Sequence, residues 1–308
     1  MTAPLAPGDE RVEEVRRVMT AKEAGAMVGT AVGTDLAPTF ASPPVGSHVR
    51  VVDKETGEPV AFVTRLPRDR AAELRAALRA SDRLLGDQAR HAKGMLGKAV
   101  TFGYLPRKPM AKREACTASS FIRDAPKIED ALERLALDLS EQFDALFPAR
   151  AAADARTIDD SVLADWRLAE KSLWTSGVIN KTSTLPYHRD GNNFETWSAM
   201  PSIRYGMAGG HLHLPEYDLT FPIGDGDVTW FYGRGLVHGV TPMRPRTGKR
   251  DDAYRYSCVF YAVRGLKDCR TYAEETRLQA VRRTERERAT AAALRERLAL
   301  NPEGGGQP

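Results

Sequence analysis

Apolar residues recur at helical spacing in the first half of the chain and alternate with polar residues in the second. The clearest helical stripe, over residues 127–147, has apolar residues three or four apart, and Pro148 directly follows it. Similar spacing predicts amphipathic helices at four places: residues 10–27, 70–85, 127–147 and 158–174. For the last of these, Thr157 with Asp160 resembles a capping box. The helices are expected to cover a sheet and to carry no chemistry themselves.

Strands are predicted where short apolar runs are separated by Gly, Pro, Asn and Asp. Two Val-rich runs, residues 48–53 and 60–66, flank a turn-rich spacer and predict a β-hairpin. Seven further runs follow: residues 178–180, 186–190, 194–205, 211–219, 228–232, 236–241 and 254–264. Their spacing is typical of an antiparallel barrel or jelly roll, and helices before strands indicate an α+β fold.

The chain therefore divides into regions by pattern. We expect a mixed helical and hairpin region over residues 1–174, packed on a jelly-roll core over residues 175–268, with the whole forming one compact domain. A charged helix is predicted over residues 269–300 and a disordered tail over 301–308. Residues 93–121 contain two close prolines and several bases, and we expect a loop there, on or near the core.

Composition adds bounds to this picture. The chain has 308 residues, of which 42% are hydrophobic and 28% charged, enough for a substantial core. A net charge of +4 permits an anionic partner without requiring one. The three cysteines show no CxxC pair and no even disulfide framework, which favours a reducing, cytoplasmic setting. No apolar run approaches a membrane span, no secretory leader is evident, and nothing indicates an obligate protein partner.

Candidate chemistry gathers in residues 186–263. If residues 186–190 form a strand, His188 and Asp190 point to the same face, and His238 lies in an apolar, Gly-flanked run further along. Two histidines and one carboxylate on one face of iron leave three positions open for a cosubstrate and O₂. Arg255 shares a strand face with Ser257, and a buried guanidinium there needs an anion such as a dicarboxylate.

Other assignments compete with this one. His211 and His213 form an H-x-H pair that could ligate a metal with a third residue, and Glu216 or Asp218 could supply a carboxylate. The two histidines could equally be the wetter side of a barrel strand. Arginines of the last helix leave a nucleic-acid face possible: Arg282, Arg283, Arg286 and Arg288. The chain has no dinucleotide-binding glycine motif, no P-loop and no nucleophile elbow.

Four motifs together carry a family resemblance: His188-Arg-Asp190-Gly-Asn-Asn193, Gly209-Gly-His-Leu-His-Leu-Pro-Glu216, Gly235-Leu-Val-His238-Gly-Val-Thr-Pro and Arg255-Tyr-Ser-Cys-Val-Phe-Tyr261. Over residues 175–264 the chain resembles the Fe(II)/2-oxoglutarate dioxygenases of the TET/JBP group, which oxidise the 5-methyl group of pyrimidines in DNA. The resemblance implies a double-stranded β-helix (jelly-roll) core, with Fe(II), 2-oxoglutarate and O₂ as cofactor and cosubstrates.

The same resemblance implies roles for individual residues. His188, Asp190 and His238 would be the iron ligands. Arg255 with Ser257 would bind the distal carboxylate of 2-oxoglutarate, and Arg113 would bind its second carboxylate. Asn193 would hydrogen-bond the target base, Tyr261 would stack on it, and Asn192 would supply a further amide nearby.

Departures from the family concern the substrate. This chain has Val263 where animal TET proteins have a base-contacting histidine, and its three cysteines cannot build their zinc-bound region. The resemblance nevertheless implies an enzyme, of phage or bacterial origin, that acts on 5-methylcytosine in DNA. A flipped base would enter the pocket while basic loops such as residues 244–250 touch the backbone. Thymine in DNA, a free nucleoside or nucleotide, another small metabolite, and a non-catalytic DNA-binding module are the alternatives.

Overall fold

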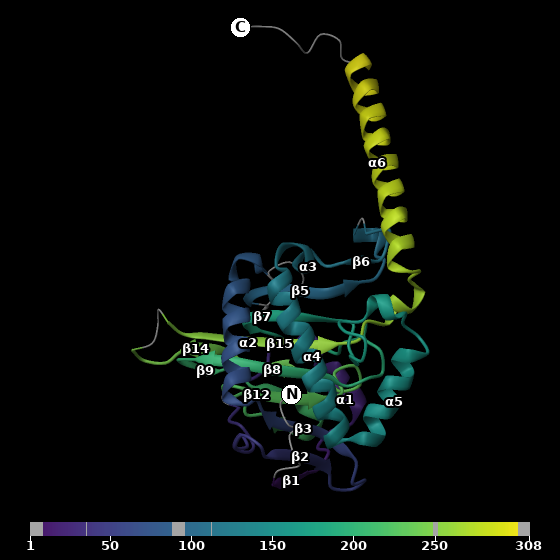
Figure 1. Ribbon diagram of the computed structural model, residues 1–308. Coiled ribbons are helices and arrows are strands. Elements are labelled where there is room, and N and C mark those ends of the chain that lie inside the picture. The colour runs from purple at the N-terminus through teal and green to yellow at the C-terminus, as the bar shows by residue number, and fades with distance from the viewer. Residues whose placement is uncertain (1–8, 35, 88–95, 112, 249–251, 301–308) are drawn as a thin grey trace.

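In the computed structural model, which describes residues 9–34, 36–87, 96–111, 113–248 and 252–300, one large sheet runs through the molecule (Figure 1). Its strands follow the order β1-β2-β3-β12-β8-β15-β7-β5-β4, with β6 paired to β5. Neighbouring strands are antiparallel except β1 and β2, which are parallel. The bounds are β1 (Glu10–Val15), β2 (His48–Asp53), β3 (Pro59–Arg65), β4 (Gly86–Asp87), β5 (Leu96–Leu105), β6 (Thr117–Ala118), β7 (Ser176–Thr184), β8 (Ser198–Tyr205), β12 (Asp227–Phe231) and β15 (Tyr254–Tyr261).

Helices cover one face of this sheet. The helices are α1 (Ala21–Ala26), α2 (Arg68–Ala80), α3 (Ser120–Asp124), α4 (Pro126–Leu146), α5 (Pro148–Asp159) and α6 (Tyr272–Leu300). Figure 1 shows α2 and α4 lying across the strands, and their apolar stripes fill the main core. Phe143 of α4, for example, stacks on Trp230 of β12 with ring centroids 5.5 Å apart. Aromatic burial of this kind fixes the helices to the sheet.

Two small sheets lie apart from the large one. One has the order β11-β10-β13, with bounds Leu219–Thr220, Leu212–Leu214 and Gly239–Val240, and the other pairs β14 (Met243–Pro245) with β9 (Met207–Gly209). A second core cluster joins Leu212 and Val240 of the three-stranded sheet to Val63 and Phe231 of the large sheet. The layers are thus helices, large sheet and small sheet. The result is a mixed α+β fold with a large, mainly antiparallel sheet.

The hairpin, three of the helices and most of the strand runs are confirmed. The hairpin forms from β2 and β3, and the helices predicted over residues 70–85, 127–147 and the charged C-terminal segment correspond to α2, α4 and α6. Residues 279–297 of α6 are solvent-exposed, and Figure 1 shows this helix projecting from the body. The predicted tail at residues 301–308 lies outside the described residues. None of the described helices combines the length and apolar character needed to cross a bilayer.

The helix predicted over residues 10–27 is wrong. Glu10–Val15 form strand β1 beside β2, and only Ala21–Ala26 are helical, behind a capping box made by Thr20 and Glu23. An open strand edge on β2 offers backbone partners that an isolated helix could not match. The side chains add to this pairing, since the Glu10 carboxylate lies 2.9 Å from Arg50 Nε.

Two further local predictions fail at prolines. The helix expected over residues 158–174 lies earlier, as α5 (Pro148–Asp159), because proline is tolerated in the first turn, where its missing N–H has no intrahelical partner. The loop expected over residues 93–121 contains strand β5 (Leu96–Leu105), which pairs with β7. Pro106 follows the last residue of β5 and so removes no ladder hydrogen bond within it.

The expectation of unpaired cysteines is also wrong. Cys116 and Cys269 form a disulfide with their Cα atoms 6.0 Å apart, and Cys258 is buried and free. The partners are separated by 153 residues, so no local spacing could reveal the pair. The fold alone brings them together.

A buried carboxyl makes the fold pH-dependent. Glu129 of α4 is 2% exposed, and its Oε1 accepts a hydrogen bond from Gly103 N at 3.0 Å. Burial raises the pKa of Glu129 to about 8, so the folded protein holds a proton that the unfolded chain releases near 4.5. This contribution to stability is fully present below about pH 4.5 and is lost as the pH rises through about 8.

We therefore expect Glu129→Gln, which keeps the acceptor for Gly103, to raise the free energy of unfolding at pH 8 by roughly 1–3 kcal/mol and to change it little at pH 4.5. Urea unfolding at both pH values measures this. Glu141→Gln, on the exposed side of the same helix, is the control. An equal gain at both pH values would show that the carboxyl does not titrate in this range.

Candidate metal centre and cosubstrate pocket

Two histidines and an aspartate meet at one point beside the large sheet. His188 and His238 exchange both backbone hydrogen bonds, at 2.8 and 3.0 Å, which places their rings with centroids 4.2 Å apart. Asp190 Oδ1 lies 3.7 Å from His188 Nε2, and Asp190 Oδ2 lies 3.8 Å from His238 Nε2. One ligand atom from each residue lies within 4.8 Å of the other two. Three such atoms match a facial metal triad.

The backbone orients both imidazoles for metal binding. His188 Nδ1 donates to Pro186 O at 2.9 Å and His238 Nδ1 donates to Leu236 O at 3.0 Å. Because a carbonyl can only accept, each ring keeps its Nε2 lone pair for a metal. The His238 side chain is 4% exposed, and this burial, with the nearby His188, lowers its pKa to about 4. Its neutral, metal-binding form therefore dominates at neutral pH.

The strand predicted over residues 186–190 is not continuous. Only His188 makes a ladder contact, as an isolated bridge to His238. Asp190 reaches the same point through a turn, where its N donates to Gly233 O at 3.0 Å. Bringing the triad together thus depends on the neighbouring 232–235 turn more than on strand alternation.

Two residues of that turn were not singled out from the sequence. A Cβ on Gly233 would lie 2.5 Å from Asp190 Oδ2, so glycine is required for the carboxylate to sit where it does. Arg234 Nη1 donates to Gly191 O at 2.6 Å and to Asn193 O at 2.9 Å, and so fastens the segment after Asp190. The only sequence signal was the Gly233-Arg-Gly235 spacing shortly before His238.

Arg255 has the environment of an anion-binding residue. It is 1% exposed, its Nη1 donates to Ser257 Oγ at 2.9 Å, and its Nε and Nη2 have no hydrogen-bond partner among the described residues. Burial, with Arg204 nearby, lowers the pKa of this guanidinium to about 9. Leaving two buried donors unpaired is costly, and a bound carboxylate would satisfy them. The side chains present therefore fit a dicarboxylate cosubstrate.

Four other predicted site residues line one cavity of about 860 Å³ together with Asp190: Arg113, Asn192, Asn193 and Tyr261. Burial raises the pKa of Tyr261, and the charge of Asp190 adds to this effect. Arg113 is half-buried, and its Nε donates to Pro106 O at 2.5 Å. The rest of the cavity wall includes basic residues that were not predicted for the site: Arg107, Lys108, Arg189, Arg264 and Lys267.

The competing histidines do not join the metal group. His213 Nδ1 lies 2.6 Å from Tyr187 Oη, and its Nε2 lies 3.3 Å from Asp218 Oδ1. His211 faces Arg204 and Arg255, and burial with these charges lowers its pKa to about 4. Glu216 is buried between Arg17 and Arg189. Within the described part of the chain, no other group of three His, Cys, Asp or Glu has metal-binding geometry.

Comparison with solved structures places this fold. The structure of NgTET1 in complex with 5mC DNA matches with a TM-score of 0.55 at 12% identity, over 85% of this chain and 99% of that one. OsALKBH1 matches at 0.41 and 13% identity, over 67% and 97% of the two chains. A Pseudomonas putida prolyl-4-hydroxylase matches at 0.37 and 12% identity, over 67% and 92%.

No family model matches the sequence, and no curated protein matches it. The structural match to NgTET1 nevertheless shows the fold. The chain has the fold of the Fe(II)/2-oxoglutarate dioxygenases, with His188, Asp190 and His238 as its candidate facial triad.

Proposed function

We propose that the protein oxidises the 5-methyl group of 5-methylcytosine in DNA, with Fe(II), 2-oxoglutarate and O₂. The observation that carries this proposal is the triad together with the buried Arg255, whose Nε and Nη2 have no hydrogen-bond partner among the described residues, in a fold shared with a protein solved on 5mC DNA. The large sheet and the three-stranded sheet would be the two walls of a double-stranded β-helix, which agrees with the core packed between them.

His188, Asp190 and His238 would hold the iron, and Arg255 with Ser257 would bind the distal carboxylate of 2-oxoglutarate. When bound, the metal and cosubstrate supply an oxidant strong enough to hydroxylate a methyl group, with release of succinate and CO₂. Arg255 does its part by pairing with a carboxylate in a dry site, which fixes the cosubstrate against rotation. Arg113, on the wall shared with Asp190, would bind the second carboxylate.

The cavity beside Asp190 would receive the base. Tyr261 offers an aromatic surface for stacking, and Asn193 and Asn192 offer amides for the base edge. A methyl group inside a duplex cannot reach a wall of this kind, so the nucleotide would have to flip out. Basic side chains at the cavity, such as Lys108 and Arg264, suit contacts with the phosphates that flank the flipped nucleotide. Val263 lies on the same wall, and its side chain cannot donate a hydrogen bond. Discrimination of 5-methylcytosine from thymine would therefore depend on the side-chain amides of Asn192 and Asn193.

The test is incubation of the protein with Fe(II), 2-oxoglutarate and duplex DNA that contains both thymine and 5-methylcytosine. Nucleoside mass spectrometry should find 5-hydroxymethylcytosine above the level of an Asp190→Ala control. Product from thymine instead would redirect the proposal to that base. Succinate formation with free nucleotides but not with DNA would select a small-molecule hydroxylase. Absence of any product, with no iron binding, would leave a non-catalytic module.

A further inference from the structure

The disulfide cross-links the chain just beyond two segments that supply much of the cavity wall and that adjoin each other, since a Cβ on Gly265 would lie 2.8 Å from Pro106 Cβ. Of the eighteen described residues that line the cavity, five come from residues 105–113 and five from residues 263–268. Cys116 follows the first segment and Cys269 directly follows the second. The cross-link thus joins the chain close to the ends of both wall segments, and the cysteines themselves are 2% and 8% exposed.

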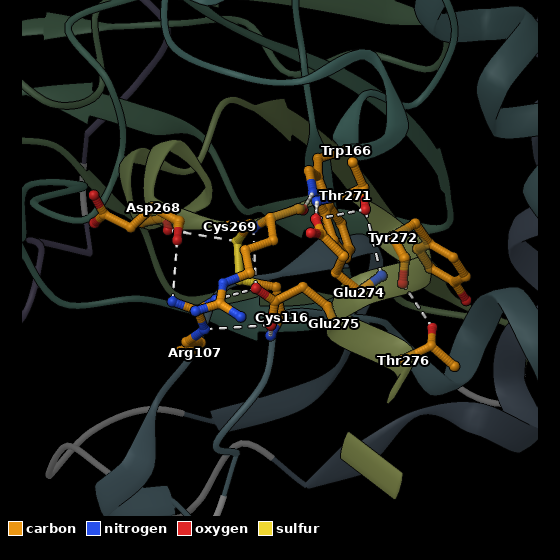
Figure 2. Close-up of polar contacts among 12 residues, drawn as sticks. Arg107, Cys116, Trp166, Asp268, Cys269, Thr271, Tyr272, Glu274, Glu275 and Thr276 are labelled. Carbon is orange, nitrogen blue, oxygen red and sulfur yellow. Dashed lines mark hydrogen bonds and ion pairs between the residues drawn. A yellow bond between two sulfur atoms is a disulfide. The ribbon is translucent and has the colours of Figure 1, made fainter. Parts of the chain in front are cut away.

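Glu275 reinforces the same junction. Its side chain is fully buried at the start of α6, where it accepts hydrogen bonds from Cys116 N at 2.9 Å and from Arg270 N at 3.0 Å. It also pairs with Arg107, a residue of the cavity wall, and Arg107 Nη1 donates to Asp268 O at 3.1 Å. Figure 2 shows these groups converging around the disulfide. One buried carboxylate therefore ties the backbone at Cys116 and at Arg270 to a single wall arginine.

The junction also reaches the segment after Asp190. Cys116 and Cys269 belong to a small core with Phe194 and Ala262, whose backbones are joined by a 2.8 Å hydrogen bond from Phe194 N to Ala262 O. Asn193 and Val263, the neighbours of these two residues, bridge each other and line the cavity. Displacement of the disulfide would therefore also change the position of Asn193. Arg255 belongs to none of these contacts.

We propose that the Cys116–Cys269 disulfide and Glu275 are positioning residues for the substrate wall, which hold Arg107 and the 263–268 segment in register for nucleic-acid binding. This inference rests on the proposed function for the identity of the substrate. It assigns to the disulfide a larger effect on the KM for DNA than on the KM for 2-oxoglutarate, because Arg255 is held separately on β15 and only Arg113 of the proposed cosubstrate residues lies on this wall.

The experiment compares the oxidised protein with the same protein treated with a dithiol, and with Cys116→Ser/Cys269→Ser. The dithiol becomes a cyclic disulfide while the protein gains two thiols, which thiol counting verifies. We expect the KM for methylated duplex DNA to rise about ten-fold on reduction, with a clearly smaller rise in the KM for 2-oxoglutarate. Hydrogen exchange of residues 105–108 and 263–268 should speed up at the same time. The double variant should not respond to the dithiol.

Glu275→Gln provides a second route to the same wall with the disulfide intact. This variant should also raise the KM for DNA. Glu274→Gln should not, because the exposed Glu274 carboxylate accepts a hydrogen bond from Thr271 Oγ1 and takes no part in the wall. Cys258→Ala controls for loss of a cysteine outside the pair. Unchanged exchange in both wall segments after verified reduction would overturn the inference. Faster exchange in a protein that never turns over DNA would uphold the wall positioning and instead contradict the proposed function.

Discussion

His238→Ala should weaken Fe(II) binding by more than about 100-fold and abolish 2-oxoglutarate turnover, since loss of a ligand costs at least as much as loss of an outer hydrogen-bond partner. His238 is the most buried member of the triad, and its Nε2 is its candidate ligand atom. Anaerobic metal titration measures the affinity, and succinate formation measures turnover.

The matched control for this result is His48→Ala. His48 lies on the β2 strand beside Glu10, with its Nε2 3.1 Å from Glu10 Oε1, and it belongs to no metal group. Its loss should leave iron affinity and turnover unchanged. If His238→Ala retained iron affinity within a few-fold of the starting protein, the triad would not be the metal site, and the proposed function would fall with it.

Arg255→Met should have opposite effects on function and on stability. Loss of a buried charge-paired contact costs about 2–5 kcal/mol, so the KM for 2-oxoglutarate should rise at least roughly 30-fold. Without cosubstrate, however, the variant should be more stable by about 1–3 kcal/mol, because two unpaired buried donors and a buried charge are removed. Steady-state kinetics and denaturant unfolding measure the two effects.

Arg255→Lys separates geometry from charge, because lysine keeps the charge but cannot make the bidentate contact. It should raise the KM for 2-oxoglutarate without the gain in stability. Arg244→Met, at an exposed position on β14, is the control and should change neither quantity. A stability loss in Arg255→Met would mean that the guanidinium already has partners in the folded protein, which would remove the main support for a carboxylate site.

Local pattern was sufficient for much of the fold but not at its edges. The stripe of α4 and the hairpin of β2 and β3 could be read from spacing because each buries one face against a continuous core. Spacing misread β1, since Val12 and Val15 are three residues apart as in a helix, whereas pairing with the edge of β2 makes this segment a strand. Prolines marked the ends of helices and strands. Whether the helix or strand lay before or after a given proline depended on its pairing partners elsewhere in the chain.

The chemistry-bearing residues were visible in the sequence, because a His-x-Asp pair, a later Gly-flanked histidine and an arginine on one strand face with a serine are the residue types that a ferrous site and an anion need. Their meeting was not visible. Asp190 reaches the triad through a turn shaped by Gly233 and held by Arg234, contacts made between residues about forty apart. The lack of partners for Arg255 Nε and Nη2 within the described part of the chain likewise arises only once the strands around Arg255 exclude water.

The sequence by itself determined the α+β class, the main helices and the residue types of a candidate ferrous site, because these follow from periodicity and ligand chemistry. Only the tertiary structure decided the pairing of Cys116 with Cys269, the exclusion of His211 and His213 from the metal group, and the shared wall of Arg107 and Asn193. Each of these depends on long-range contacts, and the free energy that selects them comes from burial of surfaces that lie far apart in the chain.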